Sequence, residues 1–423
     1  MNLNPIAIGI RWAGGGVYSP SLFLDFANTS LSLDSRITFS RASNATYFDS
    51  TGTLQTAGSG VARANAFQDY NPSTLAPLGF LIEEQRTNLF LYSAQFDDAT
   101  WGKANCTITA NSVTSPAGTT TADTLTITAA GGAINQTTQS FTAGSTVTFA
   151  VFAKKNASNF VRIEIGNLVN CWWNLNTGAT ASNNAGSGNV LFSAKSIQAI
   201  NNGWYRCSVT VTTSVLTTLG VLIFATDTDN NTSSINSSIY LWGAQAEVGA
   251  FPTSYIATTT AAATRLADSA SITGTNFSSW YNQSEGTFVT QFSVYALGTG
   301  VNRRLWNADD GTLNQRYSTF IDNGAAVNYV VQDGGVDQAN LVAAPLLTAN
   351  TTAKTAQSYK SADFASCVNG GTVLADLFGT LPTVNTFRIG NFSAGTNQLS
   401  GHIQRLAYYR TRLSNETLQS LTA

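Results

Sequence analysis

The chain has 423 residues, of which 10% are charged and 11% are aromatic, and its formal net charge is −2. So few charges with so many rings exclude a disordered chain, and the slightly negative balance excludes a broad basic surface for nucleic acid. No run of apolar residues is long enough to span a membrane, so we expect no membrane insertion.

The polar surface must come from Ser, Thr, Asn and Gln, because charged residues are scarce. These residue types favour strands and turns and disfavour helix interiors. The composition therefore predicts an all-β chain.

Residues 1–92 have an irregular pattern. Short strand candidates lie at 22–26 and 36–40, and turn residues such as those at 71–73 follow them. The segment has too little periodic apolar sequence for a large core of its own. We expect it to be ordered by contacts with the next domain or with a partner chain.

Residues 93–256 show clear strand patterns. Val161–Ile165 and Cys207–Thr212 alternate with period two, and Thr146–Ala153 is apolar on both faces, as a central strand is. Turn residues separate short strands every ten to fifteen residues or so, which predicts a sandwich or jelly roll.

Residues 257–264 are small and of low complexity, which indicates a linker.

A third block, 265–423, follows, and Thr287–Val294 alternates as a strand does. One helix is predicted near its end: Ser414 can be the N-cap, and Leu413 and Leu418 occupy the positions of a hydrophobic staple. The fold we expect is two tandem antiparallel β-sandwich (jelly-roll) domains after an irregular N-terminal attachment segment.

Several stretches resemble known families. Phe39–Tyr47 and Leu81–Leu89 are similar to a junction found in bacteriophage virion proteins. Asn202–Cys207 and Tyr240–Glu247 resemble the carbohydrate-binding-module-type jelly roll that follows this junction, and residues 251–256 close that block in the same way. Gly401–Tyr409 is similar to a strand of concanavalin A-like, laminin-G-like lectin domains. The resemblance implies a structural or adhesive part of a phage particle: a tail fibre, a spike or a capsid-decorating protein.

The acidic residues are candidates for catalytic groups. Glu83 and Glu84 lie beside Arg86, where surface or inter-chain ion pairing is the favoured role. Glycoside hydrolysis needs two carboxylates around one bond, and the third block contains no Glu-x-Asp-x-Glu triplet of the kind concanavalin A-like glucanases use. Ser-His-Asp catalysis would have to use His402, the single histidine, which alternation places within a strand.

Little in the sequence indicates a metal site or a disulfide. Cys106, Cys171, Cys207 and Cys367 have no zinc-site spacing; Cys207 fits a buried apolar role, and a disulfide between two of the four stays open. The oxygen-rich stretches at 227–230 and 309–311 fit calcium loops but are favoured as ordinary turns. No metal and no cofactor are expected.

The tryptophans are the natural candidates for sugar stacking, because a flat ring packs on the apolar face of a pyranose. We expect Trp101, Trp204 and Trp242 to pack in the core. Trp306, beside two arginines and two aspartates, is a candidate for carbohydrate binding, with core packing as the alternative.

Trp172 and Trp173 must face opposite sides of a strand. Cys171, Trp173 and Leu175 form one apolar face, which should be the core face; Asn170, Trp172 and Asn174 form the other. A ring flanked by two amides suits a sugar-stacking surface or an inter-subunit contact. We therefore expect an exposed Trp172, with Asn170 and Asn174, as a carbohydrate-binding surface.

These observations favour a non-enzymatic protein of a phage particle, with no catalytic residues, exposed on the virion after assembly in the host cytoplasm. Its expected partners are other phage structural proteins through residues 1–92, further copies of itself in a homotrimer, and a host surface glycan. The alternatives are a depolymerase that hydrolyses host polysaccharide and a purely architectural decoration protein without a ligand.

Overall fold

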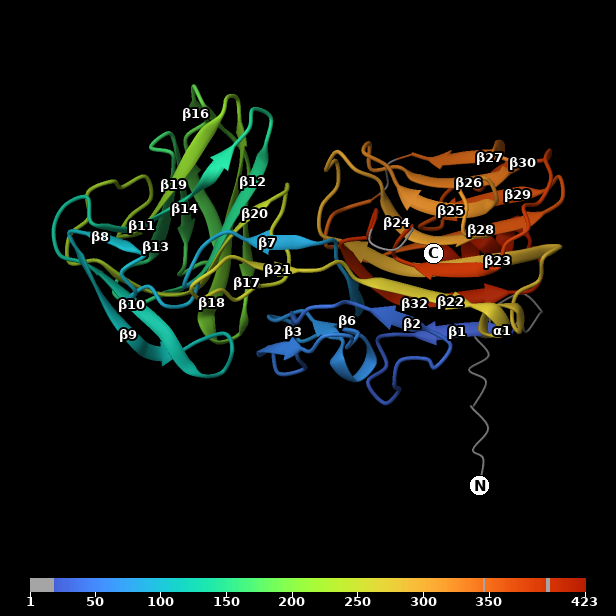
Figure 1. The fold of residues 1–423 in the computed structure, drawn as a ribbon, viewed down its shortest axis with the longest axis horizontal. Helices are drawn as coiled ribbons and strands as arrows, with labels where there is room; N and C mark the ends of the chain where they lie inside the picture. Colours follow the sequence, from blue (N-terminus) through green and yellow to red (C-terminus); the bar gives the residue numbers. More distant parts are fainter. Residues whose placement is uncertain (1–18, 345–346, 393–395) are drawn as a thin grey trace.

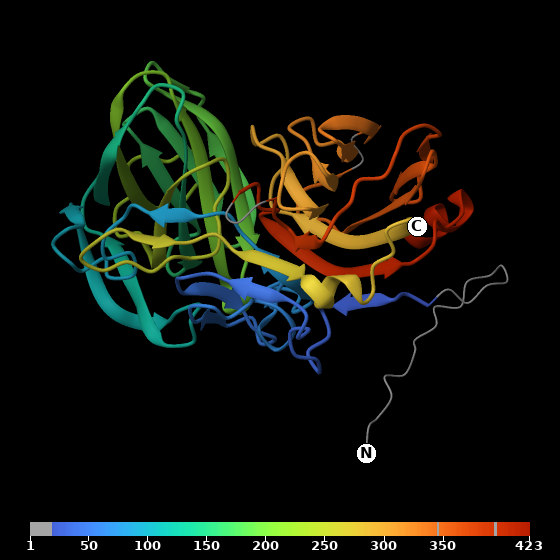
Figure 2. The same cartoon turned by 45° about the vertical axis from the view of Figure 1, so that its right-hand side comes forward.

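The computed structural model describes residues 19–344, 347–392 and 396–423. It contains two β-sandwiches side by side, with the N-terminal segment beneath the second (Figures 1 and 2). All strand pairs are antiparallel among the described residues, which confirms the prediction of an all-β chain of antiparallel sandwiches. No helix in those residues is long and apolar enough to cross a bilayer.

The first sandwich is built from two sheets whose inner faces share one core. The seven-stranded sheet has the order β16 (Gly186–Ser187), β17 (Val190–Ala199), β18 (Trp204–Thr213), β12 (Thr146–Lys155), β20 (Ser238–Val248), β10 (Thr120–Ile127) and β9 (Cys106–Thr114). The six-stranded sheet has the order β15 (Ala179–Asn183), β14 (Val169–Asn174), β13 (Phe160–Ile165), β19 (Thr217–Thr226), β11 (Ala133–Phe141) and β8 (Gly102–Ala104). The expected core tryptophan Trp101 is in this core, whereas Trp204 and Trp242 are buried in a smaller cluster beside it.

The second sandwich also has two sheets. One has the order β30 (Leu374–Asp376), β29 (Phe364–Val368), β28 (Ala353–Lys360), β23 (Glu285–Val294), β32 (Gly401–Tyr409), β6 (Pro77–Ile82) and β5 (Asp69–Tyr70), with β1 (Leu22–Asp25) also paired to β32. The other has the order β2 (Thr38–Ser40), β22 (Ser269–Thr273), β31 (Thr386–Ile389), β24 (Arg303–Asp309), β25 (Arg316–Ile321), β26 (Val327–Asp333) and β27 (Val336–Ala343).

The remaining elements are short. β3 (Ala45–Phe48) pairs with β4 (Leu54–Ala57), and β7 (Arg86–Asn88) pairs with β21 (Ala263–Arg265). The helices are α1 (Gly274–Ser278), α2 (Asn415–Thr422) and the 3-10 turns η1 (Asn65–Phe67) and η2 (Asn201–Gly203). At α2, Ser414 accepts a hydrogen bond from the Thr417 amide, and Leu413 and Leu418 are buried in one cluster, which confirms the predicted N-cap and staple.

The described part of the N-terminal segment belongs to the second sandwich, and this corrects the expectation that residues 1–92 form a separate segment. β1 and β6 lie end to end along one edge of β32, and β2 pairs with β22. Leu22, Leu24, Phe26, Phe80 and Ile82 are in the core of that sandwich. The segment has contacts outside itself with both later blocks, and those with the next domain were expected. Its strands pair with the last block of the chain, whereas Phe48 and Leu54 pack in one cluster with residues of the first sandwich. Residues 1–18 of the predicted segment lie outside the described residues.

The expected linker over 257–264 is likewise part of the fold. Thr258 is buried and its hydroxyl donates to the Phe90 carbonyl at 2.6 Å, and β21 begins at Ala263. β21 and β7 run side by side between the two sandwiches (Figure 1). The chain therefore enters the first sandwich through β7 and leaves it through β21, the strand that pairs with β7.

A buried cluster of charges lies where these segments meet. Arg63 donates to Glu83 at 2.7 Å and to Asp268 at 2.6 Å, Arg41 contacts Asp268 at 3.0 Å, and Arg265 contacts Glu83 at 3.1 Å. All five side chains are at most 1% exposed. The predicted ion pairing of Glu83 is thus confirmed, but it lies inside one chain and not on a surface or between chains.

The same cluster reaches the first sandwich through Ser254, whose amide and hydroxyl donate to Glu83 at 2.8 and 2.6 Å. Burial on its own raises the pKa of Glu83, but the guanidinium groups of Arg265 and Arg63 and the hydrogen bonds from Ser254 outweigh it and lower that pKa to about 2. The carboxylate therefore stays charged in the interior.

Replacing Glu83 should destabilise the fold at neutral pH. In Glu83→Gln the neighbouring guanidinium groups lose their buried counter-charge, which costs about 3–5 kcal/mol of unfolding free energy. A folded-state pKa of about 2 against an ordinary 4.5 also means that the wild-type contribution is complete above about pH 4.5 and is lost as the pH falls toward 2. Urea denaturation at pH 7, 4 and 3 measures both effects.

Glu84→Gln is the matched control, since Glu84 is the neighbouring carboxylate but is 21% exposed. It should cost clearly less, and its stability should fall with acid as steeply as that of the wild type. Equal losses for the two variants, or an unchanged acid slope in Glu83→Gln, would contradict the central role of the cluster.

Candidate functional site

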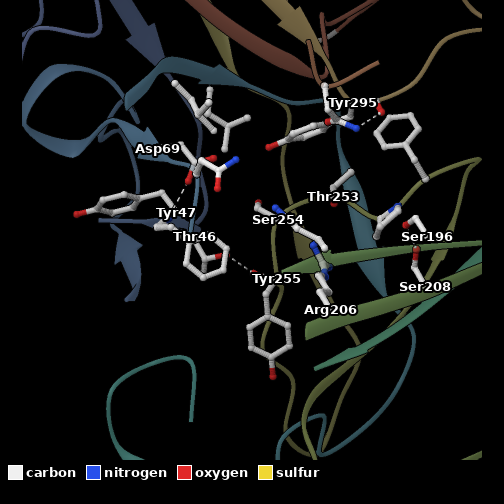
Figure 3. A pocket seen from close by; sticks show the side chains of 18 of the residues that line it. Thr46, Tyr47, Asp69, Ser196, Arg206, Ser208, Thr253, Ser254, Tyr255 and Tyr295 are labelled. Atoms are coloured by element: carbon white, nitrogen blue, oxygen red, sulfur yellow. Dashed lines mark hydrogen bonds between the residues drawn. The ribbon is translucent and has the colours of Figure 1, made fainter. Parts of the chain in front are cut away.

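A cavity of about 440 Å³ lies where the two sandwiches and the N-terminal segment meet. Its wall combines Thr46, Tyr47 and Asp69 from the N-terminal segment with Ser196 and Arg206 from the first sandwich (Figure 3). The second sandwich contributes a further part of the wall from β23 and β32. The cavity therefore depends on all three parts of the chain.

Aromatic rings and hydroxyl groups line much of this cavity. Tyr47 and Tyr295 lie on opposite sides of the view in Figure 3. Thr46 donates to the Tyr255 carbonyl at 2.7 Å, which ties β3 to the end of the first sandwich. Burial raises the pKa of Tyr295, so its hydroxyl stays protonated at neutral pH. Rings with neighbouring hydroxyls are the surface that sugars bind.

One part of the wall is a hydrogen-bonded chain of Ser293, His402 and Asp69. His402 lies on β32 directly opposite Ser293 on β23, which confirms that it is a strand residue. Its Nε2 is 2.9 Å from the Asp69 carboxylate and its Nδ1 is 3.5 Å from the Ser293 hydroxyl. Asp69 also accepts the Phe48 amide at 2.7 Å. These are the residue types of a hydrolase triad, but the serine contact is at the outer limit of a hydrogen bond.

Arg206 is the most unusual residue of the cavity. It is 8% exposed, its guanidinium lies 5.3 Å from the Phe152 ring, and its Nε and Nη2 have no hydrogen-bond partner within the described residues. Burial lowers the pKa of Arg206, while the carboxylates of Glu247 and Glu83 counteract the shift. Arginine nevertheless keeps its charge at neutral pH.

Trp306 is not available for sugar binding, which corrects that expectation. Its side chain is 0% exposed and packs in the core of the second sandwich, 4.3 Å from the ring of Phe288. A register shift in β24 between Arg304 and Trp306 turns Trp306 inward, although residues two apart in a regular strand share a face. Arg304 instead stacks 4.1 Å from the Phe320 ring.

Trp172 is the second correction. Alternation is as predicted: Trp173 is in the core, whereas Asn170, Trp172 and Asn174 share the outer face of β14. Trp172 is nevertheless only 3% exposed. The segment between β19 and β20 covers it, with the Asn231 carbonyl accepting its Nε1 at 3.1 Å, and Arg162 lies between it and Phe224. Asn170 and Asn174 are half-buried beside a ring that has no free face for a sugar.

The other sequence candidates form structural contacts. Glu84 pairs with Arg86 and with Arg303. All four cysteines are free, so no disulfide joins them. The stretch at 227–230 forms a bend and a turn, and the stretch at 309–311 is the end of β24 followed by a bend, with Asp309 paired to Arg388. The described part of the chain contains no cluster of three or more metal-ligating side chains.

Sequence reasoning missed the residues that line the cavity. Arg206 lies within the motif 202–207, and alternation places it with Ser208 and Thr210 on the face of β18 opposite Cys207, Val209 and Val211. That pattern identifies a polar face. It does not indicate that the N-terminal segment and β32 close over this face, because those contacts join residues that are far apart in the chain.

No protein-family model matches the sequence, and neither does any curated protein. Among solved structures, the chain is similar to the CBM40 module of the Ruminococcus gnavus IT-sialidase bound to α2,3-sialyllactose, with 17% identity and a TM-score of 0.30, over 34% of this chain and 84% of that one. It is also similar to the NanB sialidase of Streptococcus pneumoniae, with 14% identity and a TM-score of 0.30, over 36% of this chain and 26% of that one. A third is the heptameric SAP-like pentraxin of Limulus polyphemus, with 11% identity and a TM-score of 0.25, over 33% and 70% of the two chains.

Both adjacent tryptophans should now matter for stability. Trp173→Ala should lower the unfolding free energy by about 3–5 kcal/mol, the usual cost of truncating a buried large ring. Trp172→Ala should cost about 2–3 kcal/mol, because the surface segment that covers it can partly collapse into the space. Urea denaturation of the full chain measures both.

Trp172→Phe keeps most of the packing against Arg162 and loses the hydrogen bond to Asn231, so it should cost about 1 kcal/mol. A Trp172→Ala variant as stable as the wild type would show that this ring is not covered in solution. The original expectation of an exposed binding ring would then be restored.

Proposed function

We propose that this protein is a glycan-binding component of a phage particle and that the glycan binds in the cavity between the sandwiches. The observation that carries the proposal is the composition of the cavity wall: tyrosine rings, side-chain hydroxyls and a buried arginine around a volume of about 440 Å³. Such a volume accommodates a small number of sugar rings. The phage origin rests on the resemblance of Phe39–Tyr47 and Leu81–Leu89 to virion junctions.

Binding without cleavage is the form of this function that the cavity favours. Glycoside hydrolysis of the usual kind needs two carboxyl groups that flank the scissile bond. Among the described residues that line the cavity, Asp69 is the one acid, and its two oxygens are held by Phe48 and His402. The competing hypothesis of a depolymerase is supported by the Ser293, His402 and Asp69 chain alone.

Filling the cavity should abolish glycan binding without unfolding the protein. Ala194 is exposed on β17 and lines the cavity, so Ala194→Trp places a large ring in its mouth. We expect the full chain to bind a subset of a glycan array and Ala194→Trp to lose at least tenfold in affinity. Ala199→Trp, on the same strand but outside the wall, is the control and should bind as the wild type does.

Two results would contradict this proposal. Binding that survives in Ala194→Trp would place the glycan elsewhere on the protein. Release of reducing ends from a bound polysaccharide would establish cleavage in place of simple binding.

We further propose that the protein assembles on the particle as a homo-oligomer, with a trimer favoured, and attaches through the N-terminal segment. Large apolar side chains exposed at one edge of the second sandwich support assembly: Val336 is 62%, Leu377 is 63% and Phe378 is 79% exposed. Such surfaces are commonly buried between subunits.

Purified particles should contain the chain in multiples of three, as quantified by mass spectrometry against a capsid protein of known copy number. Phe378→Ser should weaken self-association in light scattering at micromolar concentration. Absence of the chain from purified particles would contradict the virion assignment, and an unchanged monomeric mass in both proteins would contradict the trimer.

A further inference from the structure

Within the described part of the chain, the charge of Arg206 has no ion-paired or hydrogen-bonded partner. The other buried arginines each donate at least one hydrogen bond to an oxygen of the protein, even where their Nε is unpartnered. Arg63 donates to Glu83 and Asp268, and Arg304 donates to the Ser318 hydroxyl at 2.5 Å. In Arg206 both Nε and Nη2 are unpartnered among the described residues. Burying a charge without a hydrogen-bonded partner costs folding free energy. Such a residue therefore indicates a ligand that supplies the missing hydrogen-bond acceptor.

The two carboxylates that act most strongly on the charge of Arg206 are those of Glu247 and Glu83, and both already accept hydrogen bonds from other groups. Glu247 is 0% exposed, and its two oxygens accept the Thr253 amide at 2.9 Å and the Thr253 hydroxyl at 2.5 Å. Glu83 belongs to the buried cluster with Arg63 and Arg265. These two groups favour the charged form of Arg206 without contacting it as ion pairs.

The other charged groups of the cavity are also committed. Asp69 is held by Phe48 and His402, and the Lys195 amine donates to the carbonyls of Ala181 and Ser182. Among the described residues of the wall, Arg206 is thus the cation whose buried donors are unpartnered, whereas Lys195 is partly exposed and already donates to two carbonyls. An incoming anion would be bound there.

The surroundings of Arg206 fit a sugar better than a small inorganic ion. The Phe152 ring supports the guanidinium from one side, and Ser208 and Thr210 lie on the same face of β18. Ser196 on the neighbouring strand contacts Ser208, with 2.6 Å between the two hydroxyls. Hydroxyl groups beside a guanidinium can bind the hydroxyls and the acidic group of one sugar residue together.

We propose that the cavity binds a glycan with a carboxylate-bearing sugar and that Arg206 hydrogen-bonds this carboxylate. The inference rests on the proposed function and narrows its ligand class to acidic glycans. Guanidinium and carboxylate form a bidentate, charge-assisted pair that a neutral sugar cannot replace.

The test compares each acidic glycan with its own carboxyl-reduced form. The probes are oligosaccharides of glucuronate, of galacturonate and of α2,8-linked sialic acid, together with the same chains after reduction of the carboxyl groups. Calorimetric titration of the full wild-type chain should show that at least one acidic probe binds tenfold or more tightly than its reduced form. The same probe should raise the thermal transition temperature of the wild type, whereas the reduced probe should not.

Variants then assign the effect to Arg206. Arg206→Gln should weaken binding of the acidic probe at least tenfold, and Arg206→Lys should lose part of that affinity because it keeps the charge but not the planar fork. Arg162→Gln is the matched control: Arg162 is also buried in the first sandwich, stacks 3.5 Å from Phe224 and has an unpartnered Nε, but it lies outside the cavity wall. It should bind the probe as the wild type does.

The outcomes separate this inference from the proposed function. Equal binding of acidic and reduced probes, binding of neutral glycans alone, or undiminished binding by a folded Arg206→Gln would overturn the inference and leave glycan binding in place. Failure of the wild type to bind any glycan, acidic or neutral, would overturn both. Should Arg206→Gln fail to fold, the wild-type comparison of acidic and reduced probes and the Arg206→Lys variant still decide the question.

Discussion

The five buried charges around Arg63 are the constraint on which the rest of the structure depends. Glu83 and Asp268 are each ion-paired with two guanidinium groups, so removing any member leaves a charge uncompensated in the interior. The members come from the N-terminal segment, from the passage between β6 and β7, and from the segment that leads into the second sandwich. Through Ser254 the cluster also holds the end of the first sandwich. The two sandwiches are therefore fixed to each other by a polar centre, in addition to the apolar core inside each one.

The cavity is a consequence of this arrangement. Ser254 and Tyr255 belong both to the wall and to the segment that the cluster anchors, and Thr46, whose carbonyl accepts from Arg63 at 3.0 Å, holds Tyr255 from the other side. A shift of the charge cluster would thus change the shape of the cavity directly. Neither sandwich on its own contains this site, since the wall requires β18, β23 and β3 together.

The features predictable from sequence are those set by local periodicity. Alternation identified the core face of β14 and the buried Trp173, and the residues around Ser414 identified the cap of α2, because each pattern depends on neighbours within a few positions. The burial of Trp172 depends on Asn231, and that of Trp306 on Phe288, and no local pattern encodes such contacts. Arg63, Glu83 and Asp268 are separated by up to 205 residues, so their association could not be inferred from spacing. The cavity was unpredictable for the same reason, since Arg206, Asp69 and His402 converge only after the whole chain has folded.

The pairing of β1 with β32 has a consequence for the order in which the chain folds. Ser21 bonds to Tyr408, a residue 387 positions later. At roughly 5–20 residues per second, the ribosome completes this partner on the order of tens of seconds after β1 emerges. During that time β1 has no partner strand and β6 has only the two-residue strand β5, so their backbone edges can pair wrongly with other chains. The first sandwich has all its strands between Gly102 and Val248 and can form first, so the last step of folding is the joining of the two ends of the chain along β32.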